Sequence, residues 1–180
     1  SENLEIAISY NNLATYYQSI GSTQEAESFF LKALRIYEKN KKIDLQIAQI
    51  YSNLGALYES QDLYNQSEIL LLKGLEIRKS LLGENHPDVA SSLLNLGILK
   101  IKQGQYKDSK EILHNSLKIF DQVIGEESLE SAAVLQVLGG VYSYGKEYEK
   151  ASEIYSAAFS INSKLLGRDH PTTAANMIGL

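Results

Sequence analysis

The sequence predicts an all-α protein in which antiparallel helix pairs stack one after another. Two series of residues support this prediction, because the members of each are spaced 42 residues apart. One series is Gly83, Gly125 and Gly167, and the other is Leu54, Leu96, Leu138 and Leu180. A fixed period of this length is typical of repeat architectures. The chain also has only two prolines in 180 residues. So few prolines favour long helices over turn-rich β structure.

The leucine series sets the register of the repeats. Leu13 lies 41 residues before Leu54, and the missing residue falls in the connection "YEKNKKID". Counting from these marker leucines gives full repeats at residues 3–43, 44–85, 86–127 and 128–169 and a partial fifth repeat at 170–180. No linker rich in Gly, Ser or Pro interrupts the series. We therefore expect residues 1–180 to form a single solenoid.

Small residues occupy three positions of every full repeat, counted from its marker leucine. They are Ala14, Gly55, Gly97 and Gly139 at plus one, Ala26, Ser67, Ser109 and Ala151 at plus thirteen, and Ala33, Gly74, Ser116 and Ala158 at plus twenty. Glycine within a helix costs about 1 kcal/mol relative to alanine. Its recurrence therefore indicates sites where two helix axes approach closely.

Large residues fill the positions between the small ones. They are Phe30, Leu71, Leu113 and Tyr155 at plus seventeen, and Ile36, Ile77, Ile119 and Ile161 at plus twenty-three. Apolar residues at three- and four-residue spacing indicate an amphipathic helix. On this pattern Leu71, Gly74 and Leu75 face the core, and Arg78 is expected to face outward.

A recurring phrase, "LLGENHPDVA" from Leu81 and "LLGRDHPTTA" from Leu165, predicts a helix end followed by a helix start. Ten residues before the marker leucines lie Asn3, Asp44, His86, Ser128 and His170. Asn, Asp and Ser are favoured N-cap residues, and proline suits the first helical position, as at Pro87 and Pro171. The glycines before them suit a left-handed helix end. A catalytic or metal role for the two histidines is disfavoured, because two repeats separate them.

Three further interpretations concern single repeats. Ser22 and Glu25 fit a capping box at the start of a second helix. His114, in "EILHNSLKIF", is interpreted as a surface or inter-repeat residue. The tyrosines ten residues after the marker leucine are interpreted as packing residues, and they are Tyr64, Tyr106 and Tyr148.

Composition narrows the classes of function. The net charge is −5 and the isoelectric point about 5.3, whereas nucleic-acid binders carry a basic surface. The chain has no cysteine, which excludes thiolate metal sites and fits a reducing compartment. No apolar run approaches the length of a membrane span. With no phosphate-binding loop or other cofactor motif, we expect a cytoplasmic protein that is not an enzyme and uses no cofactor or metal.

The pattern of small and large residues resembles the tetratricopeptide repeat, specifically the 42-residue variety of kinesin light chains. The phrases "NNLATYY", "SNLGALY" and "LNLGILK", and then "EAESFFLKALRIY" and "QSEILLLKGLEIR", carry this resemblance over essentially the whole chain. Two residues depart from it. Lys100 replaces a tyrosine of the other repeats, and Val137 replaces an asparagine. The resemblance implies a right-handed superhelix whose first helices line a concave groove.

Transferred position by position, the resemblance implies a peptide-binding groove. Its candidate residues are Asn11, Asn12, Thr15, Asn53, Glu59, Leu94, Asn95, Ile98, Ile101, Lys102, Gln136 and Tyr144. The row Asn12, Asn53 and Asn95 resembles asparagines that hold a peptide main chain. Bonding between neighbouring helices is the alternative. Leu94, Ile98 and Ile101, bordered by Lys102, predict a pocket for a bulky apolar side chain.

The expected function is a scaffold that binds a protein or peptide partner, with cargo or adaptor recognition implied by the resemblance. Lysine and arginine are absent two residues before the marker, so the clamp for chaperone carboxylates is not expected. The alternative is self-assembly into a homo-oligomer through exposed stack ends, because the chain stops at Leu180 within a first helix and terminal repeats need a polar outer face.

Overall fold

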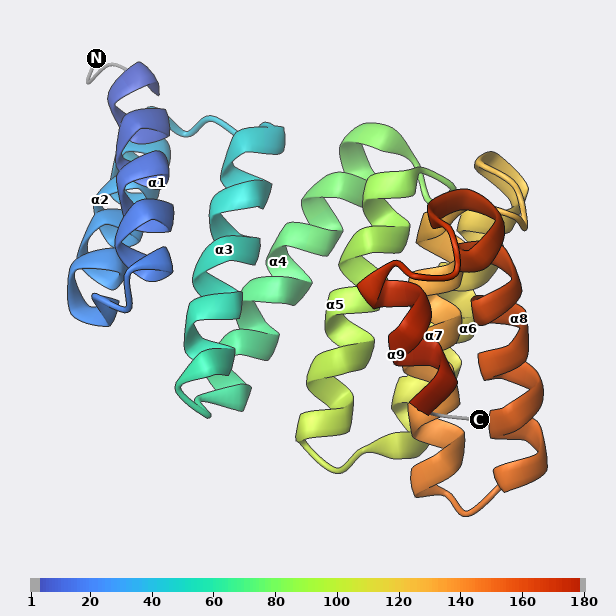
Figure 1. Cartoon of the computed structure of the whole chain (residues 1–180). Coiled ribbons are helices and arrows are strands. Elements are labelled where there is room, and N and C mark those ends of the chain that lie inside the picture. The colour runs from blue at the N-terminus through green and yellow to red at the C-terminus, as the bar shows by residue number, and fades with distance from the viewer. Residues whose placement is uncertain (1–3, 179–180) are drawn as a thin grey trace. The chain divides into compact units, whose positions relative to one another are not determined.

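The computed structural model describes residues 4–178, and these residues contain nine α-helices. The helices are α1 (Leu4–Ser19), α2 (Thr23–Asn40), α3 (Leu45–Ser60), α4 (Tyr64–Leu82), α5 (Pro87–Lys102), α6 (Tyr106–Val123), α7 (Leu129–Tyr144), α8 (Tyr148–Leu166) and α9 (Pro171–Ile178). Each full repeat supplies one pair, α1 with α2 through α7 with α8, and the two helices of a pair pack together (Figure 1). The predicted all-α repeat fold is confirmed.

The contacts divide the chain into two compact units, Ser1–Glu84 and Asn85–Leu180. Unit 1 contains α1 to α4 and unit 2 contains α5 to α9. The boundary falls at the predicted junction between the second and third repeats. That all the repeats form one continuous solenoid stays a prediction.

The glycine one residue after the marker leucine creates the same close crossing in three repeats. A Cβ on Gly55 would lie 3.0 Å from Leu71 Cδ2, and one on Gly97 would lie 2.6 Å from Leu113 Cδ2. In the fourth repeat a Cβ on Gly139 would lie 2.8 Å from Tyr155 Cε1. The large neighbour is always the residue at plus seventeen. The absent side chain therefore makes room for the second helix, as the sequence predicts.

The position at plus twenty forms a second crossing, against the residue six before the marker leucine. A Cβ on Gly74 would lie 3.0 Å from the carbonyl oxygen of Ala48. In the third repeat the hydroxyl of Ser116 donates to the corresponding carbonyl of Ala90 at 2.7 Å. A serine is tolerated there because its hydroxyl is satisfied within the buried crossing.

The turn inside each repeat has one backbone geometry. Eight residues after the marker, φ is positive at Gly21 (78°), Asp62 (60°), Gly104 (75°) and Lys146 (61°). The N–H of the following residue then donates to a carbonyl five residues back, for example from Ser22 to Tyr17 at 2.9 Å. This bond is typical of a Schellman helix end.

The same bond explains why the predicted capping box is wrong. The side chain of Ser22 makes no capping hydrogen bond. A capping box also needs a free N–H on the cap residue for the glutamate to accept. The N–H of Ser22 is already bonded to Tyr17, so Glu25 has no donor to bond there.

The junctions between repeats confirm the predicted helix stop and start, with one correction. Gly83 has φ 85° and ψ 164°, and Gly167 has φ 91° and ψ 159°. The positive φ was expected, but ψ is extended and not left-handed helical. This region of backbone space is essentially restricted to glycine. These positions therefore need glycine more strictly than a left-handed helical conformation would.

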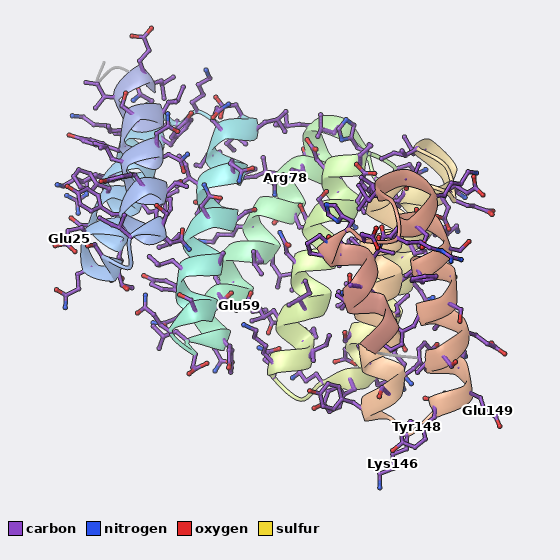
Figure 2. The ribbon with its side chains drawn as sticks, viewed as in Figure 1. Glu25, Glu59, Arg78, Lys146, Tyr148 and Glu149 are labelled. Carbon is purple, nitrogen blue, oxygen red and sulfur yellow. The ribbon has the colours of Figure 1, made fainter. Side chains whose placement is uncertain are left out.

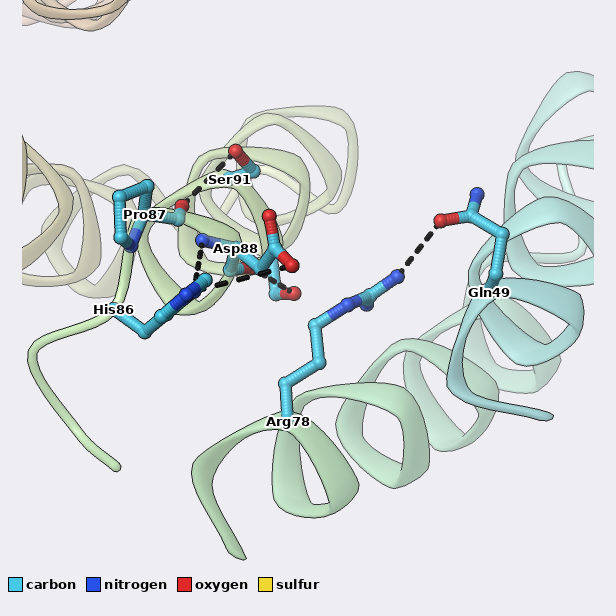
Figure 3. A network of polar contacts seen from close by, with 7 residues as sticks. Gln49, Arg78, His86, Pro87, Asp88 and Ser91 are labelled. Atoms are coloured by element: carbon cyan, nitrogen blue, oxygen red, sulfur yellow. Dashed lines mark hydrogen bonds and ion pairs between the residues drawn. The ribbon is translucent and has the colours of Figure 1, made fainter. Parts of the chain in front are cut away.

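The first helices begin at capping side chains. Asp44 Oδ1 accepts from the N–H of Gln46 and of Ile47, and Ser128 Oγ accepts from the N–H of Ser131. His86 Nδ1 accepts from the N–H of Asp88 at 3.1 Å (Figure 3). His170 Nδ1 accepts likewise from the N–H of Thr172 at 3.3 Å. Both histidines therefore act as helix caps, which fits the helix start predicted at each phrase. Asn3, like Leu180, lies outside the described residues.

Candidate functional site

The predicted groove residues all lie on the first helices of their repeats. In unit 1, Asn11, Asn12 and Thr15 lie on α1, and Asn53 and Glu59 lie on α3 (Figure 2 labels Glu59). In unit 2, α5 carries Leu94, Asn95, Ile98, Ile101 and Lys102, and α7 carries Gln136 and Tyr144. None of these side chains is buried. Each unit therefore presents part of the predicted set to solvent.

In unit 1, two of the predicted asparagines bond to each other. Asn53 Nδ2 donates to Asn11 Oδ1 at 3.0 Å, from α3 to α1. Asn53 Oδ1 accepts from Gln49 Nε2 at 2.8 Å. The alternative interpretation, bonding between neighbouring helices, thus describes Asn53. An amide has two N–H groups and two acceptor sites, so these bonds fix the orientation of the Asn53 amide and leave one N–H able to bind a ligand.

Arg78 anchors the other end of this polar network, and its predicted outward orientation is wrong. Arg78 is only 8% exposed. One terminal nitrogen donates to Ser52 Oγ at 2.8 Å. The other donates to Gln49 Oε1 at 3.1 Å (Figure 3). Tyr37, Phe120 and Asn162 occupy the same repeat position, twenty-four after the marker, and they are also buried. Arginine can occupy this buried position because polar groups of α3 accept its N–H groups.

In unit 2, the same helix face is apolar on α5. Leu94, Ile98 and Ile101 are half-buried and lie two before, two after and five after the marker leucine. At these positions the other repeats carry smaller or polar residues. They are Asn11, Thr15 and Gln18 in the first repeat, Ser52, Ala56 and Glu59 in the second, and Gln136, Gly140 and Ser143 in the fourth. Since three repeats fold without large apolar residues there, the fold does not require them in the third repeat.

The Asn11–Asn53 bond also accounts for Val137. In unit 1, Asn53 lies one residue before the marker leucine of the second repeat. It meets Asn11, which lies two residues before the marker leucine of the first repeat. The corresponding residues of unit 2 are Val137 and Leu94, on α7 and α5, two helices that contact each other. By this correspondence, an asparagine at position 137 would find a leucine, not an amide, at the place that Asn11 takes in unit 1. The departure from asparagine thus fits the apolar character of α5.

Exposed tyrosines lie at helix ends beside the turns inside the repeats of unit 2. The rings of Tyr106 and Tyr144 stack, with centroids 5.6 Å apart and planes inclined by 18°. Their exposed fractions are 39% and 70%, and that of Tyr148 is 64% (Figure 2 labels Tyr148). The interpretation as a packing residue is therefore wrong for Tyr148, whereas Tyr106 packs its ring against Tyr144 and is partly exposed. Tyr64 is half-buried, and its hydroxyl donates to Asp62.

His114 is an exposed inter-repeat residue, as interpreted. Its Nε2 lies 3.1 Å from the hydroxyl of Tyr142 on the next repeat. The ammonium groups of Lys110 and Lys150 lie 4.1 Å and 4.6 Å from the centroid of the same ring. Partial burial, followed by the charges of Lys150 and Lys110, lowers the pKa of His114. His114 is therefore held in its neutral form at lower pH than an isolated histidine.

In residues 4–178, no three or more His, Asp or Glu side chains come together as metal ligands. Among the same residues, no helix is both long and apolar enough to cross a lipid bilayer.

The recurrent crossings, the shared turn geometry and the exposed first-helix faces define a helical repeat protein made of stacked α-hairpins. Tetratricopeptide repeat family models match residues 6–40, and residues 46–108 and 88–164. The chain belongs to the tetratricopeptide repeat family. No curated protein sequence matches it.

Solved structures with the same fold share little sequence with this chain. BtubC (BKLC) from P. vanneervenii is 24% identical with a TM-score of 0.83, and the alignment covers 93% of this chain and 67% of that one. A putative kinesin light chain from Podosopora anserina, with nearly identical TPR-like repeats, is 22% identical with a TM-score of 0.83, over 100% and 86% of the two chains. A Rap protein complexed with competence and sporulation factor is 20% identical with a TM-score of 0.78, over 91% of this chain and 44% of that one.

Proposed function

We propose that the protein is an interaction scaffold that binds an extended peptide segment of a partner on its first-helix faces, as in cargo or adaptor recognition. The observation that carries the proposal is the half-buried stripe of Leu94, Ile98 and Ile101 on α5. Its three positions hold large apolar side chains in this repeat alone among the four full repeats. Apolar surface that the fold does not require is a mark of a binding site.

The surroundings of the stripe give the expected ligand its chemistry. An apolar ligand side chain would contact Ile98 and its neighbours, with Lys102 and the stacked Tyr144 at the rim. The amides of Asn12 and Asn95, both exposed, offer donors and acceptors to a peptide main chain. The oriented amide of Asn53 has the same capacity in unit 1. A cytoplasmic location, favoured by the cysteine-free sequence, belongs to this proposal.

The test compares two isoleucine-to-aspartate variants. Peptides selected from a random library on the wild-type protein are measured against Ile98→Asp, which places a charge in the stripe. Ile69→Asp is the matched control, because Ile69 is 57% exposed on α4 and lies outside the proposed surface. We expect Ile98→Asp to weaken binding at least about tenfold and Ile69→Asp to leave the affinity unchanged. Equal affinities in both correctly folded variants would remove the stripe from the binding site.

Self-association is the second candidate, and α1 favours it. Ile6, Leu13 and Tyr16 are 44%, 42% and 58% exposed. The corresponding residues of the second repeat, Ile47, Leu54 and Leu57, are at most 5% exposed, because α2 packs against α3. The equivalent face of α1 could bury the same kind of contact between two copies. Light scattering across a concentration series tests this, and a constant monomer mass would eliminate self-association.

A further inference from the structure

Unit 1 contains two pockets at equivalent places of its two repeats. The first, of about 320 Å³, is lined by Ile6, Tyr10, Lys32, Arg35 and Ile36. The second, of about 300 Å³, is lined by Ile43, Tyr51, Lys73, Glu76, Ile77 and Ser80. Tyr10, Lys32, Arg35 and Ile36 correspond in the repeat to Tyr51, Lys73, Glu76 and Ile77. None of the lining residues belongs to the predicted groove, so both pockets lie apart from it.

The two pockets differ in charge at one repeat position. The first pocket has two cations, Lys32 and Arg35, and no acidic residue in its lining. In the second, Glu76 stands in the place of Arg35 and balances Lys73. A further negative charge lies near the second pocket, since Glu38, after burial, raises the pKa of Tyr51. Only the first pocket is therefore positively charged.

The cations of the first pocket are available to a ligand. Among the described residues, neither Lys32 nor Arg35 forms an ion pair. The ammonium group of Lys32 lies 4.6 Å from the ring centroid of Phe29 and 5.9 Å from that of Tyr10. These contacts hold the charge beside the pocket. Lys32 and Arg35 are three residues apart on one helix face, so their like charges repel each other, and a bound anion would relieve this repulsion.

The walls of the first pocket are apolar. Ile36, only 6% exposed, supplies an aliphatic surface, and the half-buried Tyr10 supplies an aromatic one. A volume near 300 Å³ is at the small end for ligand sites, so the pocket has room for one side chain or a group of similar size. Arginine recognises a carboxylate through two parallel N–H donors.

We propose that the pocket of Tyr10, Lys32 and Arg35 binds a carboxylate carried beside an apolar side chain in a peptide segment of a partner protein. The carboxylate bonds Lys32 and Arg35, and the apolar side chain packs against Tyr10 and Ile36. The carboxylate belongs either to the C-terminus of the segment or to an acidic residue within it. The site is additional to the proposed groove and does not depend on it.

The experiment uses the whole chain labelled with 15N and N-acetylphenylalanine as the probe, followed by amide chemical shifts. We expect saturable shifts at residues 6–10 and 32–36, with a dissociation constant on the order of 1 mM, because the charges are partly exposed. N-acetylphenylalanine amide, which has the same ring and no charge, should bind about tenfold more weakly. Equal binding of the two probes would overturn the role of the carboxylate.

Charge exchange between the pockets supplies the matched variants. Arg35→Glu gives the first pocket the charges of the second and should abolish the shifts there, and Arg35→Gln should weaken them in a milder change. Glu76→Arg gives the second pocket two cations and should create new shifts at Tyr51 and Lys73. Shifts that persist in both Arg35 variants, or that spread over lysines outside the pocket, would refute the site.

Two further measurements fix the source of the ligand and the independence of the site. Acetylated Glu-Phe with an amidated end and acetylated Gly-Phe with a free end separate an internal acidic residue from a C-terminus, and failure of both to bind would contradict a peptide ligand. Ile98→Asp, which disrupts the proposed groove, should leave the shifts unchanged. Their loss in that variant would show that the two sites are not separate.

Discussion

The side-chain amide of Asn53 on α3 donates to the side-chain oxygen of Asn11 on α1 over 3.0 Å, and so links the first helices of two consecutive repeats. The corresponding pair in unit 2 is Leu94 and Val137. The same pair of repeat positions is thus polar in unit 1 and apolar in unit 2. This difference sets the chemistry of the face on which we propose that a partner binds.

The bond between Asn11 and Asn53 predicts that substitutions of the two residues have coupled effects on stability. Asn53→Val alone should lower the free energy of unfolding by about 1 kcal/mol, because the Asn11 amide loses its partner. Asn11→Leu with Asn53→Val reproduces the pair of unit 2 and should recover most of this loss. Urea unfolding of the wild type, both single variants and the double variant measures the coupling. Strict additivity of the two single effects would contradict direct coupling.

The glycine crossings predict opposite effects of one substitution at two sites. Gly97→Ala should destabilise the protein by about 1–3 kcal/mol, because the new Cβ would lie 2.6 Å from Leu113 Cδ2. Gly140→Ala is the matched control on α7, since its Cβ would meet only the hydroxyl of Tyr155, at 3.5 Å. In the control, the free energy of unfolding should rise by up to about 1 kcal/mol, because alanine favours the helix more than glycine does. Thermal unfolding of both variants checks the sign, and a gain in Gly97→Ala would contradict the crossing.

Lys146 predicts a stabilising substitution. Its φ of 61° is unfavourable for a residue with a side chain by roughly 1 kcal/mol, and two of the equivalent turns carry glycine. Lys146→Gly should therefore raise the unfolding free energy by about 0.5–1 kcal/mol. Lys118→Gly removes the same side chain from within α6 and should lower it by about 1 kcal/mol. If both variants lost stability equally, the turn would impose no strain on lysine.

Tyr58 predicts a loss of stability at alkaline pH. Its hydroxyl donates to Glu27 at 2.7 Å. Burial, with this bond and the charge of Glu27, raises the pKa of Tyr58 from 10.0 to about 12. The unfolded chain therefore releases the proton first, and stability should fall as pH rises from 10 toward 12. Thermal melts across this range should show a shallower decline in Tyr58→Phe, which has no proton to lose there. An unchanged slope would contradict the linkage.

The fold was predictable because its signals repeat. Gly55, Gly97 and Gly139 each face the large residue sixteen positions later. A single alignment of the repeats therefore locates all three crossings. The orientation of Arg78 was predicted wrongly because a charged residue is expected to face solvent, whereas this repeat position is buried in every repeat. Aligning it with Tyr37 and Phe120 supplies the signal that could have found it.

Two features were missed, one in a local turn and one between repeats. Ser22 and Glu25 match a local motif, but the N–H that the motif needs is bonded to the preceding helix. The stacking of Tyr106 on Tyr144 joins residues 38 positions apart in the sequence, at places where the other repeats do not carry two aromatic residues. The pattern of a single repeat does not contain the stacking of the two tyrosines.

A glycine and a capping position stand together at three of the four junctions between repeats, and this has a consequence for how such a chain can evolve. Because Gly83 and His86 end one hairpin and begin the next through bonds close to the junction itself, a segment of 42 residues carries its own boundaries. It can be duplicated, deleted or exchanged in one genetic event without redesign of the joint. Recognition can then diversify one hairpin at a time while the framework persists.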